Sequence, residues 1–268
     1  MTRSGTRNKS FRTRAAQSLL IRTGAASIRA AIPLYVAALR QKAVDRGLSG
    51  TLVPPYDPGA LAQVLGVSEV RRKALDCDGR IVRGFTGLAI ELNKQDDQSQ
   101  RVRFTFAHEV GHLILWKSAG AVRAVAARGH GAPTEIERLC DMLAAEILAP
   151  EADLRAMFRV ERTGRPPAAE TVRRVAERFK TSLHFAAVRL RAFLNVKFGA
   201  GLANVTGEYW DWQLGISTPD SLLETLKRSL SVPQERPRRE YFDDARRRPV
   251  PFDAVNIGAD RILVVIPA

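Results

Sequence analysis

The sequence predicts an α+β protein in which helices surround a small antiparallel β-sheet and a mixed C-terminal segment follows. Apolar residues recur at helical spacing in 26–46 and in 101–117. Branched residues dominate two short runs, 80–84 and 86–93, which read as β-strands joined at Gly84. A chain of 268 residues is long enough to bury a core as one large domain or as two small ones.

Composition restricts the class of protein further. Apolar residues make up 45% of the chain and charged residues 26%, which argues against wholesale disorder and against a fibrous repeat. No charge-free stretch approaches the roughly 18 residues of a membrane span, so we expect no membrane association. The only cysteines are Cys77 and Cys140, which excludes a disulfide scaffold and favours a reducing, cytoplasmic location.

The net charge of +14 is concentrated towards the N-terminus. Residues 1–44 carry nine basic side chains and no acidic one, whereas residues 201–268 carry nine bases and ten acids. Such an excess suggests a nucleic acid or another anionic partner. We expect residues 1–24 to form a flexible basic tail that makes weak nucleic-acid contact. The rest then divides into a main domain, 25–198, and an extension of open role, 199–268.

Turn residues organise the first half of the chain. Pro33 is an awkward inclusion in the 26–46 helix and is expected to mark its true start. Residues 59–75 are predicted to form a short helix, a turn and a second helix. The strands follow, then the helix over 101–117, and a segment rich in Gly, Ala and Arg over 118–133 is expected to be a loop.

Capping residues organise the second half. Thr134 is a predicted N-cap, with Glu137 at the capping-box position, for a helix that ends at Pro150. Residues 168–194 hold two more helical stretches that break near Thr181 and Ser182. After residue 199 the pattern is mixed and closes with a predicted strand over 261–266.

One motif in the sequence indicates a metal-binding catalytic site. His108-Glu109-Val110-Gly111-His112 is an HExxH pattern inside a predicted helix. Residues at i and i+4 share a helix face, so both imidazoles reach a single zinc ion. Glu109 lies on a neighbouring flank, where its carboxylate accepts a proton from a metal-activated water as general base.

A catalytic zinc site needs a third protein ligand. Glu137 and Asp141 lie at i and i+4 on the next helix, so Glu137 is the expected ligand and Asp141 is expected to orient a ligand imidazole from outside the coordination sphere. Glu135, Glu146 and His130 compete for the ligand role. His130 is also the candidate to stabilise the oxyanion.

At these residues the sequence resembles the ImmA/IrrE family of bacterial metallopeptidases. The resemblance spans roughly 30–195, and the chain departs from the family pattern at Cys140, where Ala is usual, at Asp141, where Asn is common, and at Leu143, where Phe is usual. The residues that match the two family motifs are Arg103, Phe104, Thr105, Ala107, His108, Glu109, Gly111, His112, Glu137, Ala144, Leu148 and Pro150.

The resemblance implies a small zincin-like metallopeptidase domain that binds Zn²⁺ and acts as an endopeptidase. Known activities in the family cleave helix-turn-helix repressors, so it implies a protein substrate of that class and a role in transcription regulation or the stress response. Some members are encoded as toxin–antitoxin partners. The oligomeric state has no signature in the sequence.

A different class of function is DNA binding. Residues 60–75 and 175–190 each have a helix-turn-helix pattern with basic residues after the turn. In that alternative the protein is a DNA-binding or toxin–antitoxin-type regulator, and its peptidase domain serves mainly as a binding module.

Overall fold

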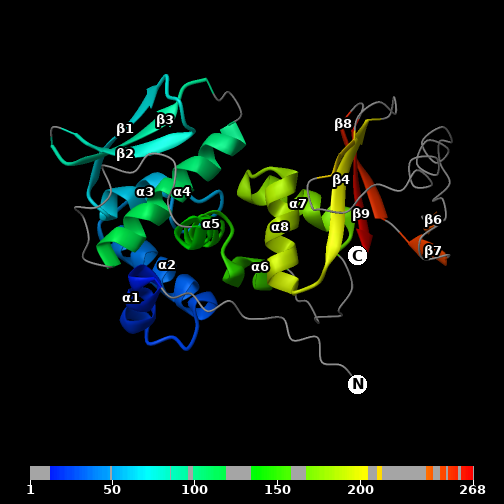
Figure 1. Ribbon diagram of the computed structural model, residues 1–268, viewed down its shortest axis with the longest axis horizontal. Coiled ribbons are helices and arrows are strands. Elements are labelled where there is room, and N and C mark those ends of the chain that lie inside the picture. The colour runs from blue at the N-terminus through cyan, green and yellow to red at the C-terminus, as the bar shows by residue number, and fades with distance from the viewer. Residues whose placement is uncertain are drawn as a thin grey trace. The chain divides into compact units, whose positions relative to one another are not determined.

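The computed structural model is shown in Figure 1. It describes residues 13–48, 50–84, 86–95, 99–118, 134–157, 167–204, 210–212, 240–243, 248–251, 253–258 and 261–267. The chain divides into two compact units, Met1–Asp153 and Leu154–Ala268. The described residues form eight helices and nine strands, so the predicted α+β class is confirmed.

The first unit begins with helix α1, Arg14–Thr23. The side chain of Thr13 caps it by accepting a hydrogen bond from a backbone N–H of the first turn. Its apolar face packs on the next helix, with Leu19 fully buried. The expectation of a flexible tail over 1–24 is therefore wrong for α1, because the run of basic residues conceals a short buried stripe. Residues 1–12 lie outside the described part of the chain.

Helix α2, Ile28–Asp45, confirms the helix predicted over 26–46. Ser27 caps its N-terminus, so Pro33 lies inside the helix and does not mark its start. The missing N–H of Pro33 removes only the bond to the carbonyl group of residue 29. Across the described residues no single helix is long and apolar enough to cross a membrane; α1 and α2 reach that length only as a pair bent by 65°.

The next segment differs from the sequence prediction. Helix α3, Pro58–Val64, is followed by strand β1, Val67–Lys73, where a second helix was expected. Val67 and Val70 are three residues apart, as on a helix face, but only Val67 is buried. Gly66, at φ +83°, turns the chain out of α3, and pairing with another strand then decides the conformation. The predicted helix-turn-helix over 60–75 is therefore wrong.

Three strands form the sheet of the first unit, in the order β1-β3-β2. Strands β2, Gly79–Arg83, and β3, Leu88–Asn93, pair in antiparallel fashion and confirm the two predicted strands. Strand β1 runs parallel to β3, so the sheet is mixed, and the prediction of an antiparallel sheet is wrong because β1 had been assigned to a helix. Figure 1 shows this sheet lying over helix α4.

Two long helices pack against each other beneath the sheet. Helix α4 spans Ser99–Ser118 and helix α5 spans Thr134–Leu148, both close to the predicted limits. Both helices are well buried, with Val110 and Leu143 fully enclosed. A short helix, α6, Glu151–Met157, follows α5. The loop predicted over 118–133 lies outside the described residues from 119 onward.

The second unit combines two helices with a larger sheet. The helices α7 and α8 are separated near Thr181 and Ser182, as predicted. The terminal strand predicted over 261–266 is also present, and the larger sheet is antiparallel in the order β5-β4-β9-β8, while β6 and β7 form a separate hairpin. The bounds are α7 Ala169–Phe179, α8 Leu183–Leu194, β4 Phe198–Asn204, β5 Trp210–Trp212, β6 Glu240–Asp243, β7 Arg248–Pro251, β8 Asp253–Gly258 and β9 Arg261–Pro267.

The division between the units falls earlier than the sequence analysis placed it. A main domain over 25–198 was expected, with an extension over 199–268. In the structure, α7 and α8 pack on strands of the C-terminal sheet, and the backbone N–H of Ala169 donates a hydrogen bond to Asp253 on β8. The two helices therefore belong to the C-terminal unit, a pairing between distant segments that local sequence patterns do not reveal.

Candidate metal centre

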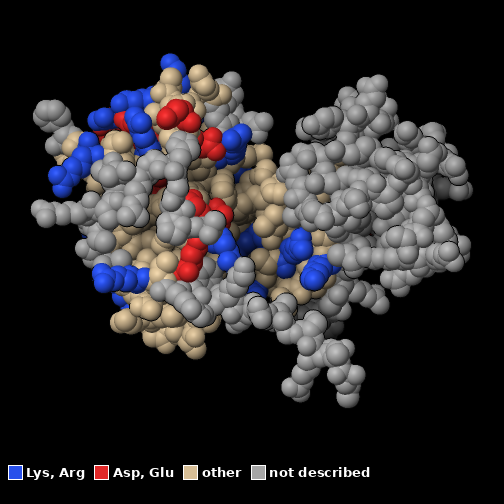
Figure 2. Space-filling view, in the orientation of Figure 1, with Lys and Arg blue, Asp and Glu red and all other residues tan. Residues whose placement is uncertain are grey.

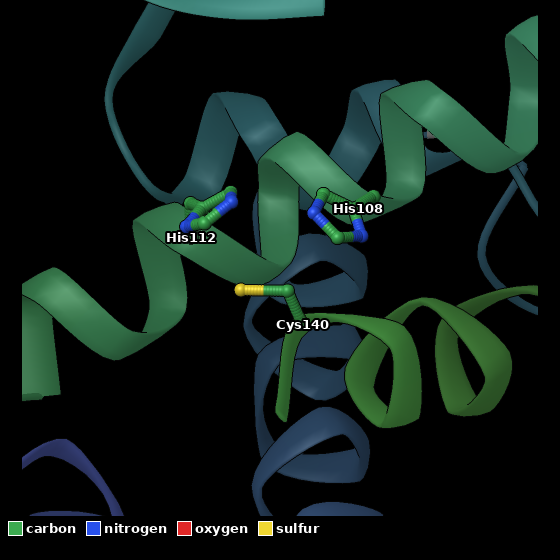
Figure 3. Close-up of side chains that lie close together, drawn as sticks. All are labelled: His108, His112 and Cys140. Carbon is green, nitrogen blue, oxygen red and sulfur yellow. The ribbon is translucent and has the colours of Figure 1, made fainter. Parts of the chain in front are cut away.

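Helix α4 places two imidazoles side by side. His108 and His112 lie one turn apart, and their ring centroids are 5.0 Å from each other. Phe104 and Trp116 lie one turn before and one turn after them, with ring centroids 6.2 Å from His108 and 5.6 Å from His112. Figure 3 shows both imidazoles on the side of α4 that faces Cys140 of α5. Sequence spacing and the family motif identified the histidines and Phe104 but not Trp116.

Helix α5 brings a carboxylate to both imidazoles. Nε2 of His108 lies 3.0 Å from Oε2 of Glu137, and Nε2 of His112 lies 3.5 Å from Oε1 of the same residue. Two bonds of about 2.0–2.1 Å at the tetrahedral angle separate their donor atoms by about 3.4 Å. Both carboxylate–imidazole separations are therefore close to those around a single zinc ion, and imidazole with carboxylate is a donor set that zinc accepts.

Asp141, one turn after Glu137, fixes the ring of His108. Its Oδ1 lies 2.9 Å from Nδ1 of His108, which leaves Nε2 directed at Glu137. Burial lowers the pKa of His108, but the hydrogen bond and charge of Asp141, with the charges of Glu109 and Glu137, raise it above its ordinary value overall. This is the arrangement expected of a carboxylate that orients a ligand imidazole from outside the coordination sphere.

The pKa of His112 is shifted in the opposite direction from that of His108. Burial and the neighbouring charge of His108 lower the pKa of His112 to about 4. The imidazole is therefore neutral at pH 7. A neutral imidazole is the form that binds a metal ion.

Glu109 is buried beside this cluster, with 9% of its surface exposed. Burial raises its pKa to about 7; the charge of His108 opposes this shift and that of Glu137 adds to it. Strand β2 passes close to Glu109 because Gly79 has no side chain. A Cβ at position 79 would lie 2.8 Å from Cγ2 of Thr105 and 3.3 Å from Cγ of Glu109. Sequence spacing identified Glu109 but gave no sign of Gly79.

The structure gives two of the rival ligands other partners. Oε1 of Glu135 accepts the backbone N–H of Thr13 at 2.8 Å. The carboxylate of Glu146 accepts the backbone N–H of Glu151 at 3.2 and 3.3 Å, where it caps helix α6. His130, the third rival and the candidate oxyanion stabiliser, lies outside the described residues, and so does the capping side chain of Thr134.

Helix α5 carries a further side chain that could bind a metal, Cys140, and the sequence did not predict it. The donor atoms of His108, His112 and Cys140 all lie within 4.8 Å of one another. Cys140 is fully buried, and burial, followed by the charges of nearby acids, raises the pKa of its thiol. In the sequence, Cys140 stood out only as a departure from the family pattern, where Ala is usual. The available signal was its position three residues after Glu137, on the same helix face.

Hydrogen bonds to the ends of α4 and α5 hold the two helices in place. At the C-terminus of α4, the hydroxyl of Ser18 and Nε of Arg22 both donate to the carbonyl oxygen of Ser118. At the C-terminus of α5, Nη2 of Arg40 donates to the carbonyl oxygen of Ile147 at 2.7 Å. Helices α1 and α2 thus bind carbonyl groups that have no partner inside α4 and α5, and so support the spacing of the donor atoms.

One comparison with known proteins covers the residues of this cluster. A family model described as Peptidase_M78, IrrE N-terminal-like domain, matches residues 60–191, a range that contains both helices of the cluster. Among solved structures, a transcriptional regulator of Mycobacterium tuberculosis is similar to this chain. The TM-score is 0.46 and the identity 11%, over 94% of this chain and 80% of that chain. No curated protein matches the sequence. Residues 60–191 are therefore similar to the Peptidase_M78, IrrE N-terminal-like domain, which is a metallopeptidase-type domain.

Proposed function

We propose that this protein is a zinc-dependent endopeptidase in which His108, His112 and Glu137 hold the ion. The single observation that carries the proposal is the Glu137 carboxylate at 3.0 and 3.5 Å from the two Nε2 atoms of HExxH. Imidazole and carboxylate donors at these separations suit zinc. When bound, a zinc ion supplies a Lewis acid that polarises the scissile carbonyl group and lowers the pKa of water to about 7.

Glu109 is the proposed proton carrier. Burial raises its pKa to about 7 in the metal-free protein, and the charge of a bound metal ion would lower it towards the carboxylate form that acts as a base. As carboxylate it takes a proton from the attacking water, and as carboxylic acid it gives the proton to the leaving amine. Asp141 holds the His108 ring, and with it the Nε2 donor, in a fixed orientation.

Strand β2 is the proposed docking edge for the scissile segment. It is an outer strand of the three-stranded sheet, and its first residue, Gly79, lies against Glu109. An extended peptide that adds to an open sheet edge gains main-chain hydrogen bonds without any sequence requirement. Pairing along β2 therefore brings a peptide bond close to the proton carrier.

The proposed substrate is a helix-turn-helix transcriptional repressor or a related regulatory protein. This part of the proposal rests on the resemblance of the HExxH and Glu137 motifs to the ImmA/IrrE family. A repressor substrate implies a cytoplasmic location and a role in transcription regulation or the stress response. The free thiols of Cys77 and Cys140 fit a reducing compartment.

The test is cleavage by the full chain loaded with zinc. Candidate repressors are incubated with the protein, and the cut is mapped by mass spectrometry of the fragments. The matched control is Glu109→Gln, which keeps the three donor side chains and removes the proton carrier. We expect a single cut that requires zinc and disappears with Glu109→Gln. Cleavage that persists in the variant would overturn the assignment of Glu109.

One observation favours a second candidate function, a DNA-binding regulator. Helices α7 and α8 are joined by only three residues, Ser182 caps α8, and α8 carries Arg189 and Arg191. Two helices joined by so short a turn are the form of a DNA-binding helix-turn-helix. Duplex binding that weakens with salt and survives Glu109→Gln would support this function, and removal of residues 1–12 measures how much the basic tail contributes.

A further inference from the structure

We propose that Cys140 is a sulfur ligand of the metal, so that the full protein donor set is His108, His112, Glu137 and Cys140. The inference rests on the metal centre of the proposed function and adds a ligand to it. Its starting observation is that the donor atoms of His108, His112 and Cys140 all lie within 4.8 Å of one another. Figure 3 shows the thiol between the two helices, with its sulfur beneath His112.

The packing of the helices explains why the sulfur lies there. Gly111 is between the two histidines in sequence, and a Cβ at that position would lie 3.1 Å from both Cα and the carbonyl oxygen of Cys140. The absence of a side chain at 111 therefore lets the backbone of α5 approach α4 directly beneath the imidazoles. Cys140 is the residue at that close approach.

The position of Cys140 on α5 also matches that of Glu137. Residues three apart on a helix are neighbours on one face, so both side chains extend towards α4. In a tetrahedral zinc site a sulfur and a nitrogen donor are about 3.5 Å apart, so the separations of up to 4.8 Å need to close by roughly 1 Å. A small rotation of the thiol and a ring achieves this. On binding, the thiol gives its proton to solvent and the sulfur forms the bond as thiolate.

A sulfur ligand changes what the centre does. Four protein ligands make a closed site of the structural type, whereas hydrolysis needs a coordination position for water. Cys140 and the attacking water therefore compete for the same position, and Cys140 restrains the basal activity. Sulfur also favours zinc and cobalt over magnesium and manganese, which accept oxygen donors.

Cobalt substitution tests the proposal with a spectroscopic measurement that does not depend on activity. The full chain is titrated with Co²⁺, and the near-ultraviolet thiolate-to-cobalt charge-transfer band is recorded together with the visible bands that report bound cobalt. We expect the charge-transfer band in the wild-type protein and in Cys77→Ser, the matched control at the only other cysteine. We expect Cys140→Ser and Cys140→Ala to bind cobalt without that band.

Affinity gives an independent measurement. Competition with a chelator should show that Cys140→Ala weakens zinc binding by at least the roughly 10–100-fold that loss of an outer-shell partner causes. Bound cobalt without the band in the wild-type protein would overturn the sulfur ligand and leave the proposed function intact. A band that vanishes only in Cys77→Ser would overturn it as well. Failure of the wild-type protein to bind zinc or cobalt would overturn the proposed function itself.

Discussion

Two glutamates in the first unit have little exposed surface but hold their protons very differently. Glu91, in the middle of the sheet on β3, is 2% exposed, and Glu109, on α4, is 9% exposed. Hydrogen bonds from Lys73 and Arg80 lower the pKa of Glu91 against the opposing effect of burial. Burial raises the pKa of Glu109 to about 7. Figure 2 shows the basic side chains gathered over the sheet that contains Glu91.

The difference shows that charged partners and depth of burial together set the pKa of a carboxylate. A carboxylate enclosed by two cations stays ionised and acts as a structural group. Glu109 is deeply buried beside His108 and Glu137, so in the metal-free protein its charged form is disfavoured. One site stabilises the sheet, and the other is suited to proton transfer.

The largest expected effect comes from removing the charge at each site in turn and measuring peptide cleavage. Glu109→Gln should lower kcat/KM by at least about 100-fold, because general base catalysis contributes 10²- to 10⁴-fold. Glu91→Gln, the matched change at the other buried carboxylate, should alter kcat/KM by less than about twofold at temperatures where it is folded. Similar losses in both variants would show that the two sites do not differ in role.

The second effect is a pH dependence of stability in the metal-free protein. The folded pKa of Glu109, about 7, lies above its ordinary value, so its favourable contribution is present at low pH and is lost as pH rises towards 7. Glu109→Gln does not ionise and should be more stable than wild type at pH 8, by up to about 3 kcal/mol, with no gain at pH 4. Urea unfolding at several pH values measures this. A difference that does not change with pH would contradict the raised pKa.

The sequence predicted the metal cluster better than the surroundings of either glutamate. His108, Glu109 and His112 are one turn of a single helix, and Glu137 and Asp141 share one face of the next. Local spacing therefore brought these five side chains together correctly. Glu91 is different, because its two cations come from strands on either side of β3. Residues 59–75 were predicted to be helical, so strand β1 was missed, and so was the ion pair that Lys73 on β1 makes with Glu91.

The sequence also did not predict where the backbones of neighbouring elements approach each other closely. Gly79 and Gly111 bring β2 to Glu109 and α5 to α4, and neither contact has a periodic pattern in the sequence. The same reason explains the misplaced domain boundary, since the packing of α7 and α8 on the C-terminal sheet joins segments that are far apart in the chain. Patterns within one element were predictable, whereas contacts between elements were not.

The third effect is on the stability of the sheet. Glu91→Gln leaves Lys73 and Arg80 without their carboxylate partner. Removing one partner of a fully buried pair destabilises by about 3–5 kcal/mol, but both cationic side chains are about half exposed, so we expect about 1–2 kcal/mol. The lowered pKa makes this contribution present above about pH 4.5 and lost as pH falls below it. Denaturant unfolding at pH 7 and pH 3 should show a loss at the first pH and a smaller one at the second.

The smallest expected effect is the contribution of Lys73 alone to the free energy of unfolding. Lys73 is one of the two cations that pair with Glu91 and have no counterpart at Glu109. Lys73→Met keeps the aliphatic side chain on β1 and leaves Arg80 to pair with Glu91, so the half-exposed ammonium group should account for only about 0.5 kcal/mol at pH 7. The same substitution made in the Glu91→Gln background should have almost no effect, because its partner is already neutral. The coupling between the two changes, measured by urea unfolding of all four proteins, is the direct contribution of the ion pair. Equal losses in both backgrounds would mean that Lys73 stabilises β1 through packing and not through Glu91.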